Sequence, residues 1–360
     1  MAPGGDNPGE NGILGTATAT HRLGLHMVSD TLDRPLRDLR ISVTDRCNFR
    51  CTYCMPKEQF GSDHDFLARS SLLDFDEIVR LVRVFADQGV RKIRLTGGEP
   101  LVRAELEHLV SGIAAVDGIE DIALTTNGSL LSSKRARTLA DAGLDRITVS
   151  LDAFDDAVFM AINDVGFPVG KVLDGIANAD AAGLNVKINT VVQRGVNEDQ
   201  ILPLAGCFRG SGHVLRFIEF MDVGTTNGWR LDDVVSAREI RDRIDAVWPL
   251  QSLEPNYPGE VARRWRYRDG TGEIGVIASV TQPFCRGCTR ARLSAEGALY
   301  TCLFAGVGTD LRGLLRSGVD DARLAEEVRS IWTRREDRYS ELRSSETVIR
   351  PKVEMSYIGG

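Results

Sequence analysis

Six of the seven cysteines form two groups of three that lie far apart in the sequence. The first group, Cys47, Cys51 and Cys54, has the spacing C-x3-C-x2-C and directly follows an apolar, β-rich run. Three thiolates on one short loop can each bind one iron of a [4Fe–4S] cube and leave the fourth iron open. A zinc site is the alternative, but it usually needs a second ligand pair nearby. The nearest histidine, His64, lies in a polar loop and is expected on the surface, so the spacing favours iron–sulfur.

The second group, Cys285, Cys288 and Cys302, has the spacing C-x2-C-x13-C. A C-x2-C pair opens many zinc ribbons, but here no fourth cysteine or histidine follows within the expected reach. The pattern therefore again favours a [4Fe–4S] cluster with an open iron. Arg290 and Arg292 stand at alternate positions of an extended segment, which points both side chains to one face. Paired guanidinium groups bind phosphate oxygens bidentately.

The seventh cysteine, Cys207, lies between Leu204 and Phe208 in a helical pattern and is expected to be a small buried apolar residue. An odd number of cysteines also speaks against a disulfide framework.

Composition and charge exclude several classes of protein. The net charge of −7 argues against a general nucleic-acid binder. No apolar run approaches the roughly 18 to 20 residues that a membrane span needs. Residues 1–30 are rich in Gly, Ala, Thr and Asn and lack the basic start and apolar stretch of a signal peptide. We therefore expect a flexible leader and a cytoplasmic protein with neither a membrane nor a nucleic-acid partner.

The two cysteine groups must be positioned by the strands and helices that alternate along the chain. Amphipathic stretches such as 75–89 separate the strands, and Gly89, Gly143 and Gly183 fit helix C-terminal positions. Such βα units predict an α/β fold, a partial (βα)6 TIM-like barrel, with its chemistry at the C-terminal strand ends. The six expected strands are 39–44, 92–97, 121–128, 146–152, 185–192 and 214–221.

The pattern changes after about residue 230. A helix at 237–249 and a hairpin at 264–280 precede the second cysteine group and two further helices, which predicts a smaller C-terminal α+β domain. The expected division is a leader at 1–30, the barrel at 31–235, the C-terminal domain with the second cluster at 236–345, and a tail at 346–360.

Several motifs resemble one known superfamily. CTYC at the end of the first cysteine group and GGEP at 97–100 are similar to the signatures of radical S-adenosylmethionine (SAM) enzymes. RFIEFMDVG, CRGCTRARLS and the terminal Gly-Gly narrow the resemblance to the GTP 3′,8-cyclases of molybdenum cofactor biosynthesis, over nearly all of 31–360. The resemblance implies two [4Fe–4S] clusters and SAM as cofactors and GTP as substrate.

The resemblance also implies a reaction and a set of contacts. A 5′-deoxyadenosyl radical from SAM removes hydrogen from ribose C3′ of GTP, C3′ attacks guanine C8, and the second cluster binds the guanine. SAM contacts are implied for Tyr53, Gly98, Ser150 and Met221. GTP contacts are implied for Arg40, Arg94, Thr125, Lys187, Arg290, Ala291 and Arg292.

Two further segments are singled out by comparison with this family. Segment 161–169 lacks the basic character that the resemblance leads us to expect, which puts a substrate contact there in doubt. Gly359 and Gly360 are slim enough to thread a narrow pocket, and the resemblance implies that the tail assists the radical step. It further implies a low-potential electron donor such as flavodoxin or ferredoxin, a downstream cyclic pyranopterin monophosphate synthase, and a homodimer or monomer.

Two alternatives remain open at this point. One is a radical SAM maturase that acts on a peptide with the help of an auxiliary cluster, although such enzymes usually carry more C-terminal cysteines. The other is a non-catalytic electron-transfer or zinc-binding module, which would not cleave SAM.

Overall fold

The computed structural model describes residues 1, 27–257, 259–344 and 350–359. Most of the expected leader and Gly360 therefore lie outside the described residues. Val28 and Asp30, which the sequence placed in the leader, differ from that expectation because both are buried. The Val28 amide donates to the Gln88 carbonyl at 3.2 Å, so the chain joins the folded body before residue 30.

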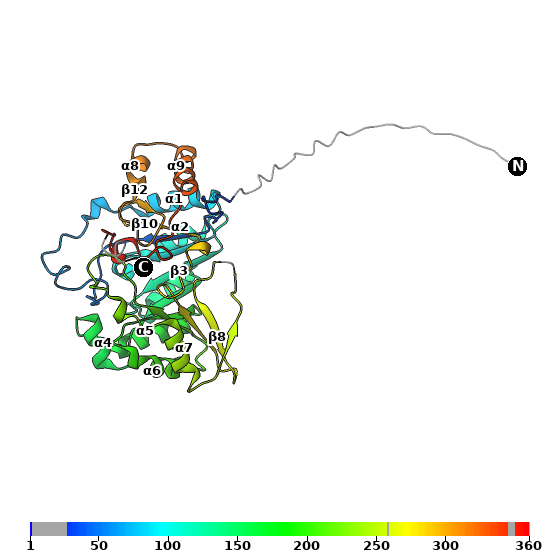
Figure 1. Cartoon of the computed structure of the whole chain (residues 1–360). Coiled ribbons are helices and arrows are strands. Elements are labelled where there is room, and N and C mark those ends of the chain that lie inside the picture. Colours follow the sequence, from blue (N-terminus) through cyan, green and yellow to red (C-terminus); the bar gives the residue numbers. More distant parts are fainter. Residues whose placement is uncertain (2–26, 258, 345–349, 360) are drawn as a thin grey trace.

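Six parallel strands, each followed by helix, form the centre of the fold (Figure 1). They lie side by side in sequence order, which confirms the predicted (βα)6 arrangement. The strands are β1 (Asp38–Ser42), β2 (Lys92–Thr96), β3 (Asp121–Thr126), β4 (Arg146–Ser150), β5 (Asn185–Val192) and β6 (Val214–Glu219).

The helices between these strands bury an apolar face against the sheet. In α1 (Phe75–Asp87) the Asp74 side chain accepts from the Glu77 amide at 2.8 Å, and Glu77 accepts in return from the Asp74 amide, so a capping box starts the helix. Gly89, at a φ of +109°, follows its end as predicted. The other helices are α2 (Leu106–Ala114), α3 (Ser133–Asp141), α4 (Asp156–Asn163), α5 (Val169–Ala181), α6 (Ile201–Phe208) and α7 (Ala237–Asp245).

Most of the predicted strands overrun the observed ones by one or two residues at their C-terminal ends. The strand predicted at 121–128, for example, ends at Thr126, and the one predicted at 146–152 ends at Ser150. The extra residues leave the ladder and form the loops at the C-terminal face of the barrel. These loops carry the motifs that the sequence singled out.

The C-terminal part extends the same sheet at both edges. At one edge β9 pairs in parallel with β6, and at the other β10 pairs in parallel with β1. The order is β12-β11-β10-β1-β2-β3-β4-β5-β6-β9-β8-β7. The added strands are β7 (Leu250–Leu253), β8 (Arg263–Tyr267), β9 (Glu273–Ile277), β10 (Arg290–Leu293), β11 (Ala298–Tyr300) and β12 (Thr309–Asp310).

Two sequence expectations for this part have different outcomes. The hairpin predicted at 264–280 is confirmed as β8 and β9. The helix predicted at 237–249 ends at Asp245, and Leu250 begins a strand that the sequence did not indicate. Helices α8 (Leu311–Arg316) and α9 (Asp321–Thr333) pack at the outer end, and α11 (Met355–Ile358) belongs to the tail.

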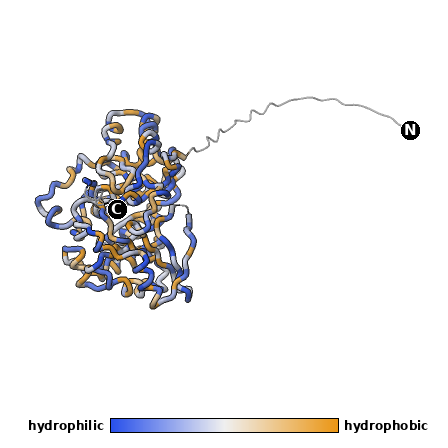
Figure 2. Tube along the Cα trace, viewed as in Figure 1, coloured by the Kyte–Doolittle hydropathy of each residue, from blue (hydrophilic) through white to orange (hydrophobic). Residues whose placement is uncertain are grey.

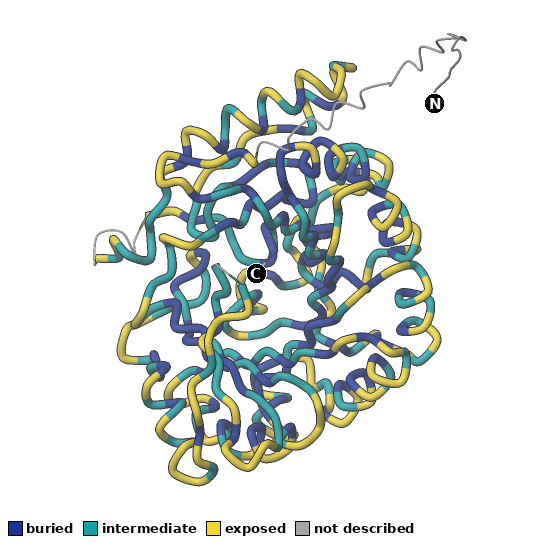
Figure 3. The backbone as a smooth tube through the Cα atoms, turned by 90° about the vertical axis from the view of Figure 1, so that its right-hand side faces the viewer, coloured by how far each residue is buried: buried dark blue, intermediate teal, exposed yellow. Residues whose placement is uncertain are grey.

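Short 3-10 helices occur at Arg69–Ser71, Pro100–Val102, Glu198–Gln200, Leu231–Asp233 and Cys285–Gly287. Among the described residues, no helix has the length and apolar character that crossing a bilayer demands. Hydrophobic and hydrophilic residues alternate along the chain (Figure 2). Buried residues of both kinds are concentrated in the central segments of the molecule (Figure 3).

Candidate active site

The first cysteine group lies on the loop after β1, and hydrogen bonds fix the backbone of that loop. The Cys54 amide donates to the Cys51 carbonyl at 2.9 Å, which closes a turn. Arg50 donates to the Cys47 carbonyl at 2.8 Å and to the Phe60 carbonyl at 2.6 Å. One guanidinium group thus ties the start of the loop to the segment that follows it.

The segment 161–169 supports this loop. The Arg50 amide donates to the Asn163 carbonyl at 3.0 Å, and the Thr52 amide donates to the Ile162 carbonyl at 3.1 Å. The structure therefore gives this segment a role as backing for the cysteine loop, and its lack of basic residues is compatible with that role.

The three cysteines of the first group are half-buried. Burial raises the pKa of Cys47 to about 11 and raises the pKa of Cys51 and of Cys54 well above the usual range. Within the described residues no three Cys, His, Asp or Glu side chains converge on a single metal ion. A [4Fe–4S] cube binds each thiolate at a different iron, so its ligands enclose a volume, and its binding would release the thiol protons. The donor set fits such a cluster.

Asp152, at the end of β4, links the cysteine loop to the barrel. This buried carboxylate accepts from the Tyr53 hydroxyl at 2.7 Å and from the Val191 amide at 2.8 Å. Burial raises its pKa to about 6. Tyr53, expected to contact SAM, is thereby held over the C-terminal end of the barrel, where Ser150 ends β4.

Glu99, in the GGEP segment, makes the equivalent link between β2 and β3. It accepts from the Thr126 hydroxyl and the Asn127 amide, both at 2.7 Å. Burial raises its pKa to about 7. The adjacent Gly98 packs so closely on the cysteine loop that a Cβ there would collide with the Arg46 carbonyl. The sequence indicated no separate role for Glu99, within the GGEP motif, or for Asp152, at the end of the predicted strand 146–152.

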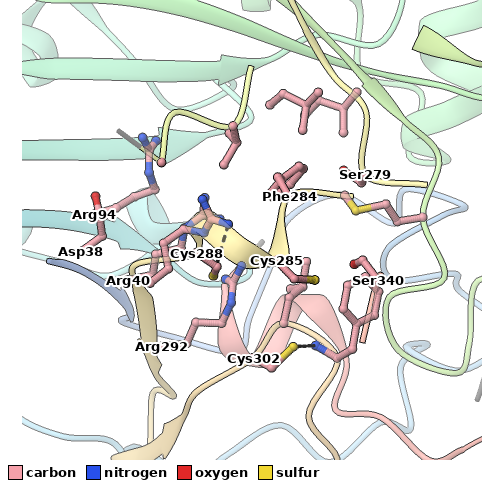
Figure 4. Close-up of a pocket in the computed structure, with 18 of the residues that line it drawn as sticks. Asp38, Arg40, Arg94, Ser279, Phe284, Cys285, Cys288, Arg292, Cys302 and Ser340 are labelled. Carbon is pink, nitrogen blue, oxygen red and sulfur yellow. Dashed lines mark hydrogen bonds between the residues drawn. The ribbon is translucent and has the colours of Figure 1, made fainter. Parts of the chain in front are cut away.

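A single cavity gathers most of the predicted substrate residues (Figure 4). Its wall is set by strand register: Arg292 on β10 lies opposite Arg40 on β1, and Arg40 lies opposite Arg94 on β2. Three arginines thus stand in a row across three neighbouring strands. The predicted residues that line this cavity are Arg40, Arg94, Thr125, Met221, Arg290, Arg292, Cys285, Cys288 and Cys302.

These arginines are crowded and poorly neutralised. Burial, followed by the neighbouring Arg292 and Arg94, lowers the pKa of Arg40 well below its ordinary value. Burial also lowers the pKa of Arg94 and of Arg292 to about 10. Arg94 donates to the hydroxyls of Thr125 at 3.0 Å and Thr148 at 3.2 Å, which bring no negative charge. Such a concentration of positive charge suits a polyanionic ligand.

Other polar residues of the cavity were missed in the sequence. Arg216 faces Asn189 across β5 and β6, and both line the cavity. Arg216 Nε and Asn189 Oδ1 are buried without a hydrogen-bond partner in the described part of the chain, so both can receive a ligand. The sequence could have indicated Asn189, because it lies two residues after the predicted Lys187 on β5, and alternate residues of a strand share one face. Lys92, Arg146 and Tyr257 also line the cavity.

Two predicted substrate residues lie elsewhere. The Ala291 side chain is fully buried in the apolar core, as expected for the residue between two inward-facing arginines. Lys187 is not among the residues that line the cavity. Burial, together with Arg216, Arg146 and Arg94, lowers its pKa to about 8, so it adds to the same positive field.

The second cysteine group lines this cavity, and its electrostatic environment differs from that of the first cysteine group. Burial alone would raise the pKa of Cys288, but Arg290 and Arg335 outweigh it and bring the pKa down to about 6. The Arg290 Nη2 lies 3.3 Å from the Cys288 Sγ. Burial and Asp337 raise the pKa of Cys302 to about 12. Three thiols around one open volume, one of them favoured as thiolate, fit a second cluster.

A buried ionic group holds the backbone of this second loop. Arg34 donates to the Cys285 carbonyl at 2.9 Å, and Arg335 donates to the Cys288 carbonyl at 2.8 Å. Both arginines pair with the carboxylate of Asp30, at 2.6 and 3.1 Å. Asp30 and Arg34, from the start of the described chain, thus position cysteines about 250 residues further on.

The tail reaches the same cavity. Met355 lines it, and the Gly359 carbonyl accepts from Arg292 Nη1. A Cβ on Gly359 would collide with the Thr96 side chain, so only glycine fits there, as the sequence predicted. Gly360 lies outside the described residues.

Two smaller expectations were wrong. Cys207 is exposed on α6, because Leu204 and Phe208 occupy the buried face and Cys207 lies outside that stripe. His64 is partly buried between the rings of Phe60 and Phe66, with ring centroids 4.7 and 4.6 Å away.

Comparison with known proteins matches two families to successive parts of the chain. Residues 41–206 match the Radical SAM superfamily, and residues 213–341 match the Molybdenum Cofactor Synthesis C family. A GTP 3′,8-cyclase of Acidothermus cellulolyticus is 55% identical over 92% of this chain and 99% of its own. One from Staphylococcus aureus is 50% identical over 93% of this chain and 100% of its own.

Solved structures with the same fold are more distant in sequence. Streptococcus suis SuiB bound to its precursor peptide SuiA superposes with a TM-score of 0.60 at 16% identity, over 82% of this chain and 67% of that one. SuiB bound to S-adenosylmethionine gives 0.59 at 15% identity, over 88% and 72%. These likenesses concern the fold alone.

Proposed function

This chain belongs to the GTP 3′,8-cyclase family of radical SAM enzymes, and from that premise we propose that it cyclises GTP. The product is (8S)-3′,8-cyclo-7,8-dihydroguanosine 5′-triphosphate, made in the first step of molybdenum cofactor biosynthesis. The observation that carries the proposal is the shared cavity, in which three thiols and a row of arginines face one volume.

We assign the residues to two groups with separate tasks, and of the first group only Met221 lines this cavity. Cys47, Cys51 and Cys54 would hold a [4Fe–4S] cluster that supplies one electron for the cleavage of SAM to methionine and a 5′-deoxyadenosyl radical. Tyr53, Gly98, Ser150 and Met221 are proposed to orient SAM at the strand ends. The surrounding protein excludes water and other quenching groups from the radical.

The substrate is proposed to lie across the cavity, with its guanine toward the second cysteine group. Cys285, Cys288 and Cys302 would hold a second [4Fe–4S] cluster, whose open iron supplies a binding point for the base. The arginine row on β10, β1 and β2, with Thr125, then holds the triphosphate and fixes ribose C3′ in reach of the SAM site. Lys187 does not line the cavity and adds only to its positive field.

Replacing Arg290 by alanine is expected to weaken GTP binding about ten- to a hundredfold, because one charge-assisted phosphate contact contributes about 1.5–3 kcal/mol. Equilibrium binding under anaerobic conditions measures this. Arg286→Ala is the matched control, because Arg286 lies four residues before Arg290 and is exposed. Unchanged affinity in Arg290→Ala, with iron content equal to wild type, would contradict the assignment.

The experiment that tests the function is an anaerobic assay with GTP, SAM and dithionite. We expect a cyclised nucleotide and 5′-deoxyadenosine without any added peptide. Formation of 5′-deoxyadenosine alone would mean that SAM is cleaved but GTP is not the substrate. If neither the cyclised nucleotide nor 5′-deoxyadenosine forms, the chain is a non-catalytic metal-binding protein and the proposal is wrong.

We further propose a cytoplasmic location, a low-potential reductant such as flavodoxin or ferredoxin, and product transfer to a cyclic pyranopterin monophosphate synthase. Asn48 and Thr52, which flank Cys51 in sequence, are exposed, and this supports electron entry at the cysteine loop. Monomer and homodimer are both compatible with this reaction.

A further inference from the structure

The tail is fixed to the body some distance before its glycine end. Residues 350–359 pass the loop after β6 and finish beside β2 and β10. The Val353 amide donates to the Ala305 carbonyl at 3.0 Å, and the short helix α11 carries the chain from there to Gly359. Two charged side chains, Lys352 and Glu354, flank this backbone contact.

Lys352 is buried, which is unusual for a lysine so close to a chain end. Its side chain is 1% exposed. The ammonium donates to the Asp222 carboxylate at 3.0 Å and to the Asp222 carbonyl at 2.8 Å. It also lies 4.9 Å from the Tyr339 ring centroid. A buried ammonium is tolerated only with such partners, so the pair has one favourable position.

Asp222 connects the tail to the cavity and also has partners outside the tail. It directly follows Met221, which lines the cavity. Arg343 pairs with the Asp222 carboxylate at 2.9 Å, and the Tyr339 hydroxyl donates to it. Loss of the lysine would therefore leave the aspartate paired within the body.

Glu354 makes the complementary contact on the same loop. Its carboxylate accepts from the Thr225 amide at 2.8 Å, from the Thr225 hydroxyl at 2.9 Å and from the Thr226 hydroxyl at 2.9 Å. Gly224 lets it approach, because a Cβ at that position would collide with the Glu354 carboxylate. The loop after β6 thus offers an acceptor to Lys352 and donors to Glu354.

The far end of the tail leaves little room for a shift. Gly359 meets Arg292 through its carbonyl and fits against Thr96 only because it lacks a side chain. A displacement of one residue would bring Ile358 to this place, and its side chain cannot fit there. The contacts of Lys352 and Glu354 and the fit of Gly359 therefore require the same alignment of the tail against the body.

We propose that Lys352 and Glu354 are positioning residues that set the register of the tail, so that Gly359 meets Arg292 at the wall of the substrate cavity. This inference rests on the proposed function in one respect, namely that the glycine end assists GTP cyclisation. The docking itself is independent of the substrate and can be measured without it.

The test uses the full-length, cluster-loaded protein with Lys352→Met and, separately, Glu354→Ala. Amide hydrogen exchange in residues 353–358 should accelerate about 10- to 100-fold, as expected for the loss of a charge-assisted contact. GTP cyclisation should fall, with unchanged iron content. A peptide of residues 350–360 should restore the rate, and the same peptide carrying Lys352→Met should not.

Arg350→Met is the matched control, because Arg350 is an exposed cation two residues before Lys352. It should leave exchange and cyclisation at wild-type values. Wild-type exchange of 353–358 in Lys352→Met overturns the positioning role whatever the activity. Deleting Gly359 and Gly360 tests the premise separately: a wild-type cyclisation rate in that protein refutes the role of the glycine end but not the docking.

Discussion

Replacing Cys51 by alanine is expected to abolish the formation of 5′-deoxyadenosine from SAM and to leave the second cluster detectable by its spectrum. A [4Fe–4S] cube with an open iron needs all three thiolates of its loop. Cys51 is partly buried and packs against the apolar core, as does Cys47 of the same group. Anaerobic incubation with SAM and dithionite, followed by chromatography, measures the nucleoside.

Cys207→Ala is the control for this experiment. Cys207 is exposed on α6 and belongs to neither group, so its loss should change neither iron content nor SAM cleavage. The assignment would be refuted by SAM cleavage at the wild-type rate in Cys51→Ala.

Replacing Cys285, Cys288 and Cys302 together should remove all cyclised nucleotide and roughly half of the iron and sulfide, because one of two four-iron clusters is lost. The first cluster lies on a separate loop with its own supports, Arg50 and Asp152, so SAM cleavage should continue without coupling to GTP. Iron and sulfide analysis and product chromatography are the measurements.

Metal analysis of the reconstituted wild-type protein adds a second criterion. Stoichiometric zinc without iron at the second site would exclude the proposed cluster. A triple variant that still cyclises GTP would show that the second group does not contact substrate.

The sequence was sufficient for the parts of the fold that local patterns determine. Alternating strands and helices predicted the six βα units, and cysteine spacing predicted two loops with three thiols each. The period-two pattern also placed Arg290 and Arg292 on one face. These features depend on residues that are near one another in the chain.

What the sequence could not supply depends on long-range pairing. No local signal indicated that β10 pairs with β1, and this pairing places Arg292 beside Arg40. The same holds for the Asp30 carboxylate between Arg34 and Arg335. The sequence placed Asp30 within the predicted leader, and no motif marked Arg335, so neither residue was assigned a role.

The parallel pairing of β10 with β1 has a consequence for how the two metal-binding loops move. One loop follows β1, and the cysteines of the other flank β10, so a continuous ladder of backbone hydrogen bonds connects them. A hinge between two domains would allow their separation to fluctuate, whereas two strands of one sheet keep a constant spacing. Thermal motion of the outer helices α8 and α9 should therefore leave the distance between the two cysteine loops unchanged, because the sheet and not a hinge sets that distance.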